Sequence, residues 1–120
     1  MKKILIVDDE PNIVMTLEYT FKKSNYEVFI ARDGQEALDI LKTNYPDIII
    51  LDIMMPMVDG FATLEQIRKD ANLTHTKVMF LSAKNKDSDI EKGLALGADA
   101  YMTKPFSIKK VVEKVEELLA

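Results

Sequence analysis

Short apolar runs alternate with segments of helical periodicity along the whole chain, and this alternation constrains the fold more than any other feature. The runs are rich in β-branched or aromatic residues, which is typical of buried strands. Strict alternation of strands and helices requires crossover connections, so it predicts a parallel sheet with right-handed crossovers and helices on both faces. We predict strands over residues 4–7, 28–30, 48–51, 78–81 and 100–102.

The segments between these runs carry apolar residues three or four positions apart, which places them on one face of a helix. Pro11 suits the first turn of a helix, Asp33 and Ser107 are candidate N-caps, and Gly97 is a candidate C-terminal glycine. These signals predict five helices. Their apolar stripes are Ile13, Leu17 and Phe21; Ala37 and Leu41; Phe61, Leu64 and Ile67; Ile90 and Leu94; and Ile108, Val111, Val112, Val115, Leu118 and Leu119.

The composition of the strands predicts their order in the sheet. The first, third and fourth runs are wholly apolar, as expected of strands that are covered on both faces. Glu27 in the second strand, and Tyr101 and Thr103 in the fifth, indicate edge strands. We therefore predict a doubly wound, flavodoxin-like α/β fold with a five-stranded parallel sheet in the order 2-1-3-4-5. Ligands of such a fold bind beyond the carboxyl ends of strands one and three.

The length and the rare residue types limit both the architecture and the chemistry. The chain has 120 residues, and we expect residues 1–120 to form one domain. It has no cysteine and only one histidine, His75, which excludes thiolate metal sites, thiol nucleophiles and clusters of imidazole ligands. The net charge of −4 argues against binding to nucleic acid. No segment is long enough to span a membrane, so we expect a cytoplasmic protein.

Acidic residues follow two strands that the predicted order brings side by side. Asp8, Asp9 and Glu10 come directly after strand one, and Asp52 comes directly after strand three. Taken alone, Asp9 or Glu10 could simply cap the helix that begins near Pro11. Taken together, like charges about 4 Å apart repel by roughly 4 kcal/mol at an effective dielectric of about 20. The group therefore needs a cation or a protonated carboxyl, and oxygen ligands favour Mg²⁺, with Mn²⁺ as the alternative.

Two further polar residues end strands at the same edge of the sheet. Ser82 ends the fourth strand and Lys104 follows the fifth. A serine there is usually a turn or cap residue, and an isolated lysine is usually solvated. Beside three carboxylates, however, Lys104 is a candidate counter-charge. The bond from Lys104 to Pro105 is one where a cis peptide costs little, and a cis bond would turn the lysine inward.

Five stretches of the chain share their residues and spacing with one known family. They are Ile4–Glu10, Asp33–Leu38, Pro46–Gly60, Leu81–Ala83 and Gly97–Phe106. With this set, the sequence resembles the receiver domain of two-component response regulators from residue 2 to residue 119. The resemblance implies a phosphorylation-activated signalling switch. Such a domain is not an enzyme, although it assists its own phosphorylation and dephosphorylation.

The resemblance also implies roles for the acidic residues. Asp52 is the phosphoacceptor, and its donor is a sensor histidine kinase or a phosphotransfer protein. Asp8 and Asp9 hold Mg²⁺ together with Asp52 and the backbone carbonyl of Met54. Phosphoryl transfer requires in-line positioning and neutralisation of oxygen charge, and an aspartate carboxylate is a known nucleophile for it.

Three more roles follow from the resemblance. Lys104 pairs with one phosphoryl oxygen, and Ser82 donates its hydroxyl to another. Tyr101 matches the family's aromatic switch position and turns into the space that Ser82 leaves. This movement alters the face formed by the fourth helix, the fifth strand and the fifth helix, and so changes the affinity for a downstream effector protein.

The same face bears on the oligomeric state. The stretch Gly93–Phe106 is similar to receivers of transcription factors, which dimerise through charged pairs on this face. Ala100, Lys110 and Lys114 depart from the acid, acid and arginine that are usual there, so we expect a monomer or a weak dimer. The chain ends with the last helix, and we expect no output domain within it and no contact of this domain with nucleic acid or membrane.

Several alternatives remain open from the sequence. Met54, Met55 and Met57 flank Pro56 and form either a soft surface for a partner or, as we favour, packing within the loop. The chain could also be an adaptor that no longer uses its phosphosite, although the full set of site residues argues against it. A hydrolase with an aspartate nucleophile would carry a second acid two residues later, where this chain has Met54.

Overall fold

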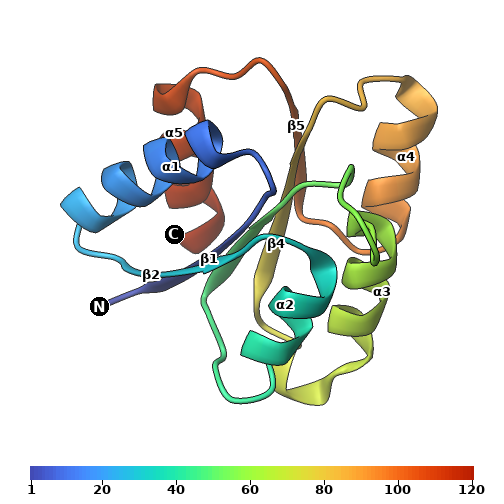
Figure 1. Cartoon of the computed structure of the whole chain (residues 1–120), viewed down its shortest axis with the longest axis horizontal. Coiled ribbons are helices and arrows are strands. Elements are labelled where there is room, and N and C mark those ends of the chain that lie inside the picture. The colour runs from blue at the N-terminus through green and yellow to red at the C-terminus, as the bar shows by residue number, and fades with distance from the viewer.

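Strands and helices alternate along the computed structural model, which describes residues 1–120 (Figure 1). The strands are β1 (Lys3–Val7), β2 (Glu27–Ala31), β3 (Ile48–Leu51), β4 (Lys77–Ser82) and β5 (Ala100–Thr103). The helices are α1 (Pro11–Lys23), α2 (Gly34–Ile40), α3 (Gly60–Lys69), α4 (Asp87–Ala95) and α5 (Ile108–Leu119), with a short 3-10 turn, η1, at Ala71–Leu73. The five predicted strands and the five predicted helices are confirmed.

All strands run parallel, in the order β2-β1-β3-β4-β5, and the predicted doubly wound α/β fold is confirmed. β1, β3 and β4 are almost fully buried, while the edge strands β2 and β5 are mostly half-buried. Parallel strands all end at the same edge of the sheet. The residues after β1, β3 and β5 therefore meet there, as the rule for doubly wound sheets requires.

Helices cover both faces of the sheet, with α1 and α5 on one face and α2, α3 and α4 on the other (Figure 1). Side chains of a strand point to alternate faces, and β3 shows how this divides the core. Ile48 and Ile50 pack with α1 and α5, whereas Ile49 and Leu51 pack with α2 and α3. The apolar stripes predicted for α1, α2, α3 and α5 supply the helix side of both cores.

Helix α4 packs on the sheet through a different face from the one predicted. The stripe of Ile90 and Leu94 was expected to face the core, but Leu94 is 46% exposed and Gly93 is the buried residue of the helix. Without a side chain at Gly93, the helix lies directly on two aromatic rings. A Cβ there would stand 3.0 Å from Phe80 Cδ2 and 3.1 Å from Tyr101 Cδ2. This close approach favours glycine where a regular stripe predicts a large apolar residue.

The predicted helix ends agree with the structure. Pro11 begins α1, and the side chains of Asp33 and Ser107 accept the N–H groups three residues further on, at 2.8 and 3.4 Å. Gly97 follows the end of α4 with a φ of +108°, a left-handed conformation that favours glycine. No helix combines the length and the apolar character needed to cross a membrane.

Candidate functional site

Two buried carboxylates lie side by side at the carboxyl edge of the sheet. Asp8 follows β1 and is 2% exposed, and Asp52 follows β3 and is 3% exposed. The two strands pair in register, and the N–H of Asp52 donates to the carbonyl of Val7 at 2.9 Å. The register of a parallel pair thus carries both acids to the same point, as expected from their positions after neighbouring strands.

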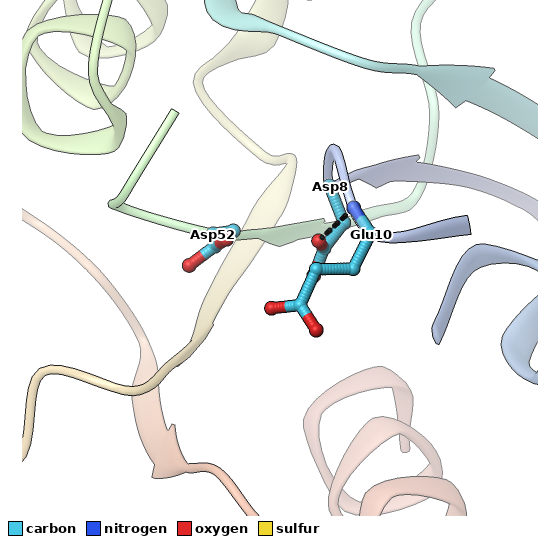
Figure 2. Close-up of side chains that lie close together, drawn as sticks. All are labelled: Asp8, Glu10 and Asp52. Carbon is cyan, nitrogen blue, oxygen red and sulfur yellow. Dashed lines mark hydrogen bonds between the residues drawn. The ribbon is translucent and has the colours of Figure 1, made fainter. Parts of the chain in front are cut away.

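Glu10, and not Asp9, completes the acidic group. One carboxylate oxygen from each of Asp8, Glu10 and Asp52 lies within 4.8 Å of the other two, and Figure 2 shows the three side chains gathered together. The N–H of Glu10 donates to Asp8 Oδ1 at 2.9 Å, which fixes the turn that leads into α1. Asp9 is exposed and lies outside this group. No side chain caps the first turn of α1, so the capping interpretation of Asp9 or Glu10 is wrong.

Lys104 brings the only cation to these carboxylates. Its Nζ lies 2.9 Å from Asp8 Oδ2 and 2.9 Å from Glu10 Oε1. The distance from Nζ to Asp52 Oδ2 is 3.4 Å. The lysine follows β5, where its N–H donates to the carbonyl of Ser82 at 2.9 Å, and its peptide bond to the next residue, a proline, is cis. Three carboxylates therefore share one ammonium group, and negative charge remains in excess.

The pKa values of Asp8 and Lys104 are both raised in this site, for different reasons. Burial raises the pKa of Asp8, and the charge of Asp52 adds to the rise, while hydrogen bonds from the N–H of Glu10 and from Lys104 oppose it. Burial lowers the pKa of Lys104, but its hydrogen bonds to Asp8 and Glu10 and the charge of Asp52 outweigh burial, so the pKa is raised. The pKa of Asp8 is therefore raised mainly by burial, whereas the pKa of Lys104 is raised by the carboxylates around it.

The two oxygens of Asp52 have different partners. Oδ1 accepts the N–H of Ile53 at 2.8 Å and the N–H of Met54 at 3.4 Å. Oδ2 has only the long contact to Lys104. Oδ2 is therefore the oxygen with the freest lone pairs, and the backbone holds the carboxylate so that this oxygen faces the lysine.

The loop after Asp52 only partly follows the packing that we favoured for its methionines. Met55 is 9% exposed and packs in the core, which confirms the interpretation for this residue. Met54 and Met57 are 55% and 84% exposed, so for them it is wrong. Met57 also has a φ of +67°, an uncommon conformation for a residue with a side chain. Two thioether side chains of this loop are therefore presented to solvent.

Ser82 and Tyr101 both contact the backbone of Lys84, in the loop after β4. Ser82 is fully buried, and its Oγ accepts the N–H of Lys84 at 3.3 Å. The hydroxyl of Tyr101 donates to the carbonyl of Lys84 at 2.6 Å, and its ring lies 5.6 Å from that of Phe80. Burial raises the pKa of Tyr101, and the charges of nearby acids add to this. The serine and the tyrosine thus contact the backbone of one residue, the serine at its N–H and the tyrosine at its carbonyl.

His75 lies far from this group, in the exposed loop between η1 and β4 at the amino edge of the sheet, as predicted. The acidic group itself offers carboxylate oxygens and no nitrogen or sulfur ligand. Mg²⁺ and other hard cations prefer such donors, and the excess negative charge around Lys104 favours an added cation. The donor set therefore fits Mg²⁺ or Mn²⁺.

Comparisons with known proteins agree on one family. The model of the response regulator receiver domain matches residues 4–116. The alkaline phosphatase synthesis transcriptional regulatory protein PhoP of Bacillus subtilis is 45% identical over 118 residues, which are 98% of this chain. These residues are 48% of that relative, so the chain spans about half of its length.

Solved structures lead to the same family. The receiver domain of the Francisella response regulator 1452 superimposes with a TM-score of 0.91 at 36% identity, over 99% of this chain and 97% of that one. The chemotaxis response regulator CheY4 of Vibrio cholerae superimposes with a TM-score of 0.93 at 30% identity, over 99% of both chains. Both structures therefore match this chain over almost its whole length.

Proposed function

The chain belongs to the response regulator receiver domain family, and from this premise we propose that Asp52 receives the signal as a phosphoryl group. It is a receiver domain of a two-component response regulator, which is a signalling domain and not a classical enzyme. The observation that carries the proposal is the geometry of Asp52, whose Oδ2 faces Lys104 within a buried acidic group. Residues 1–120 act together as one such domain.

The proposed step is a phosphoryl transfer between two proteins. Asp52 Oδ2 attacks the phosphorus atom of a phosphohistidine on a sensor histidine kinase or a phosphotransfer protein. An O–P bond forms, the P–N bond breaks, and the electron pair of that bond remains on the imidazole nitrogen. Lys104 then pairs with one phosphoryl oxygen, and Ser82 donates its hydroxyl to another. The Ile53 N–H holds Oδ1, so that Oδ2 points at the incoming phosphorus.

Asp8, Asp9, Asp52 and the backbone carbonyl of Met54 are the proposed holders of Mg²⁺, with Mn²⁺ as a substitute. Mg²⁺ supplies charge neutralisation for the phosphoryl oxygens when it is bound. The burial of Asp8 and Asp52 supports this assignment, because two buried carboxylates need more positive charge than Lys104 provides. Asp9 would reach the ion only after turning from its exposed position.

The proposed output is a change in the face formed by α4, β5 and α5. Ser82 moves toward the phosphoryl group, and Tyr101 turns inward behind it. The shared contact with Lys84 supports a coupling of the two, because movement of either side chain disturbs the backbone of the same residue. A downstream effector protein, or a second copy in a weak dimer, then reads the altered face. The domain acts in the cytoplasm and contacts neither nucleic acid nor membrane itself.

Incubation with acetyl phosphate and Mg²⁺ tests the proposal. Intact mass should show one added phosphoryl group, and Asp52→Asn should remove it. Asp87→Asn is a matched control, because Asp87 is exposed at the start of α4 and makes no side-chain hydrogen bond. Labelling of Asp52→Asn at the wild-type rate would contradict the assignment. Steady turnover of a phosphoester would instead favour a hydrolase.

A further inference from the structure

Lys104 contacts three carboxylates, and these partners are not equivalent. An ammonium group has three N–H donors, and the three contacts at 2.9, 2.9 and 3.4 Å occupy all of them. The side chains of Asp8 and Asp52 are each 3% exposed, whereas that of Glu10 is 57% exposed. Lys104 is therefore saturated by two buried acids and by one acid that water reaches.

A phosphoryl group on Asp52 would need at least one of these donors. Release of Asp8 would take a hydrogen-bond donor from a buried carboxylate, and water has little access to replace that donor even when Mg²⁺ is bound. Release of Glu10 costs far less, because water can replace the ammonium around an exposed carboxylate. The difference in exposure thus singles out Glu10 as the partner that Lys104 can exchange.

The backbone around Glu10 suits such an exchange. Its N–H stays bonded to Asp8 Oδ1 at 2.9 Å, so the turn keeps its shape while the side chain moves. Figure 2 shows the Glu10 side chain reaching from this turn into the space that it shares with Asp8 and Asp52. Since the carboxylate makes no cap hydrogen bond in α1, its release leaves no helix donor unpaired.

We propose that Glu10 is a positioning residue that holds Lys104 in the unphosphorylated domain and gives it up when a phosphoryl group arrives. The inference rests on the proposed roles of Asp52 and Lys104. Glu10 competes with the phosphoryl group for one N–H of the Lys104 ammonium. It therefore sets the concentration of phosphodonor that is needed to populate the phosphorylated state. Its removal should favour that state.

Titration with beryllofluoride, a mimic of the phosphoryl group, at saturating Mg²⁺ tests this competition. Glu10→Gln should bind the mimic roughly two- to fivefold more tightly than wild type, the range expected when a partly exposed ion pair is removed. The gain should shrink as salt is raised, because salt screens exposed charges. Glu65→Gln, an equal charge change on the exposed surface of α3, should match wild type.

The same titration in a Lys104→Met background shows whether Glu10 acts through the lysine, and there the Glu10→Gln effect should largely disappear. An undiminished effect would overturn the proposal. So would equal affinities of Glu10→Gln and wild type, or weaker binding that excess Mg²⁺ restores, since the latter would make Glu10 a holder of the ion. If wild type takes up neither the mimic nor a phosphoryl group from acetyl phosphate, the proposed function itself fails.

Discussion

The two ends of the sheet carry their charges in opposite ways. At the carboxyl end, Lys104 is shared by three carboxylates, and negative charge is left over. At the amino end, the guanidinium of Arg68 contacts one carboxylate, Asp99, at 3.0 Å. Its other contacts are to neutral carbonyls, those of Gly97 at 3.0 Å and Thr76 at 2.9 Å. The Arg68–Asp99 pair at the amino end is electrically balanced, and the acidic group at the carboxyl end is not.

The charged side chains at the two ends of the sheet also differ in how far they are buried. The side chains of Arg68 and Asp99 are 23% and 30% exposed, so water reaches the balanced pair. The side chains of Asp8 and Asp52, which carry the excess charge, are each only 3% exposed. Excess charge out of reach of water opposes folding. The excess charge at the carboxyl end thus lowers the stability of the fold, as expected of a site proposed to bind a cation and a phosphoryl group.

The amino end instead joins separate elements. Arg68 belongs to α3, Thr76 precedes β4, and Gly97 and Asp99 lie in the connection from α4 to β5. Asp99 Oδ2 also accepts the N–H of Val78 at 2.8 Å. One arginine therefore links a helix, a central strand and the connection to the edge strand. We regard this cluster as structural, and the comparison can be tested by disturbing each end in turn.

The largest effect is expected at the amino end. Arg68→Ala removes three hydrogen bonds and leaves Asp99 without its cation, so we expect a loss of about 3 kcal/mol in the free energy of unfolding. Urea denaturation measures this loss, and Lys69→Ala, an exposed neighbour on α3, is the control. The folded variant should still accept a phosphoryl group at the wild-type rate. A folded but unreactive variant would show that the two ends are coupled.

An intermediate effect is expected at alkaline pH, which removes the charge of Lys104 at the carboxyl end of the sheet. The pKa of Lys104 is raised in the folded state, so its stabilisation is complete below the ordinary lysine value and is lost as pH rises through the raised value. Arginine keeps its charge throughout this range. Between the ordinary and the raised lysine pKa, the free energy of unfolding of wild type should fall by at most about 1.4 kcal/mol per pH unit relative to that of Lys104→Met.

Urea denaturation at a series of pH values measures this slope. Lys109→Met, a change at an exposed lysine of α5, should keep the wild-type slope. Equal slopes for wild type and Lys104→Met would show that the carboxylates do not hold the lysine proton. The charge excess at the carboxyl end would then be smaller than the geometry indicates.

The smallest effect is a gain in stability at the carboxyl end. Without divalent metal, Asp52→Asn removes one of the carboxylates, while Lys104 keeps its contacts with Asp8 and Glu10. The asparagine carbonyl can still accept the N–H of Ile53. We expect the free energy of unfolding to rise by about 1 kcal/mol, because like charges no longer face one another in a buried site.

Thermal and urea unfolding in the presence of a chelator measure this gain, with Asp87→Asn as the charge-matched control at an exposed position. A loss of stability would mean that the contact between Asp52 and Lys104 outweighs the repulsion between carboxylates. The carboxyl end would then resemble the amino end, and the contrast between them would not hold.

Much of the fold could be predicted because its signals are local. The continuous apolar runs of the central strands, the helical stripes and the polar residues of the edge strands all lie in short stretches, and they lead to the observed sheet order. Helix α4 departs from the prediction because its place depends on neighbours. Gly93 faces the core and Leu94 faces solvent, since the helix sits directly on the rings of Phe80 and Tyr101.

The amino-end cluster is another feature that sequence reasoning missed. Arg68 and Asp99 are separated by 31 positions, and neither stands in a motif that indicates an ion pair. An arginine in the last turn of a helix has a simpler interpretation, as a favourable charge near the helix dipole. Only the packing of α3 beside the connection from α4 to β5 brings the two side chains together.

By itself, the sequence determined the order of the strands, the family, and the meeting of Asp8 with Asp52, because parallel strands end at a common edge. The tertiary structure decided which other acid joins them. Asp9 and Glu10 both follow β1, and no local pattern separates them. The contact between Lys104 and Asp8 spans 96 positions. The third carboxylate at the ammonium is the one that the turn after β1 directs toward it. That partner is Glu10, because pairing of charges depends on distance in space and not on distance along the chain.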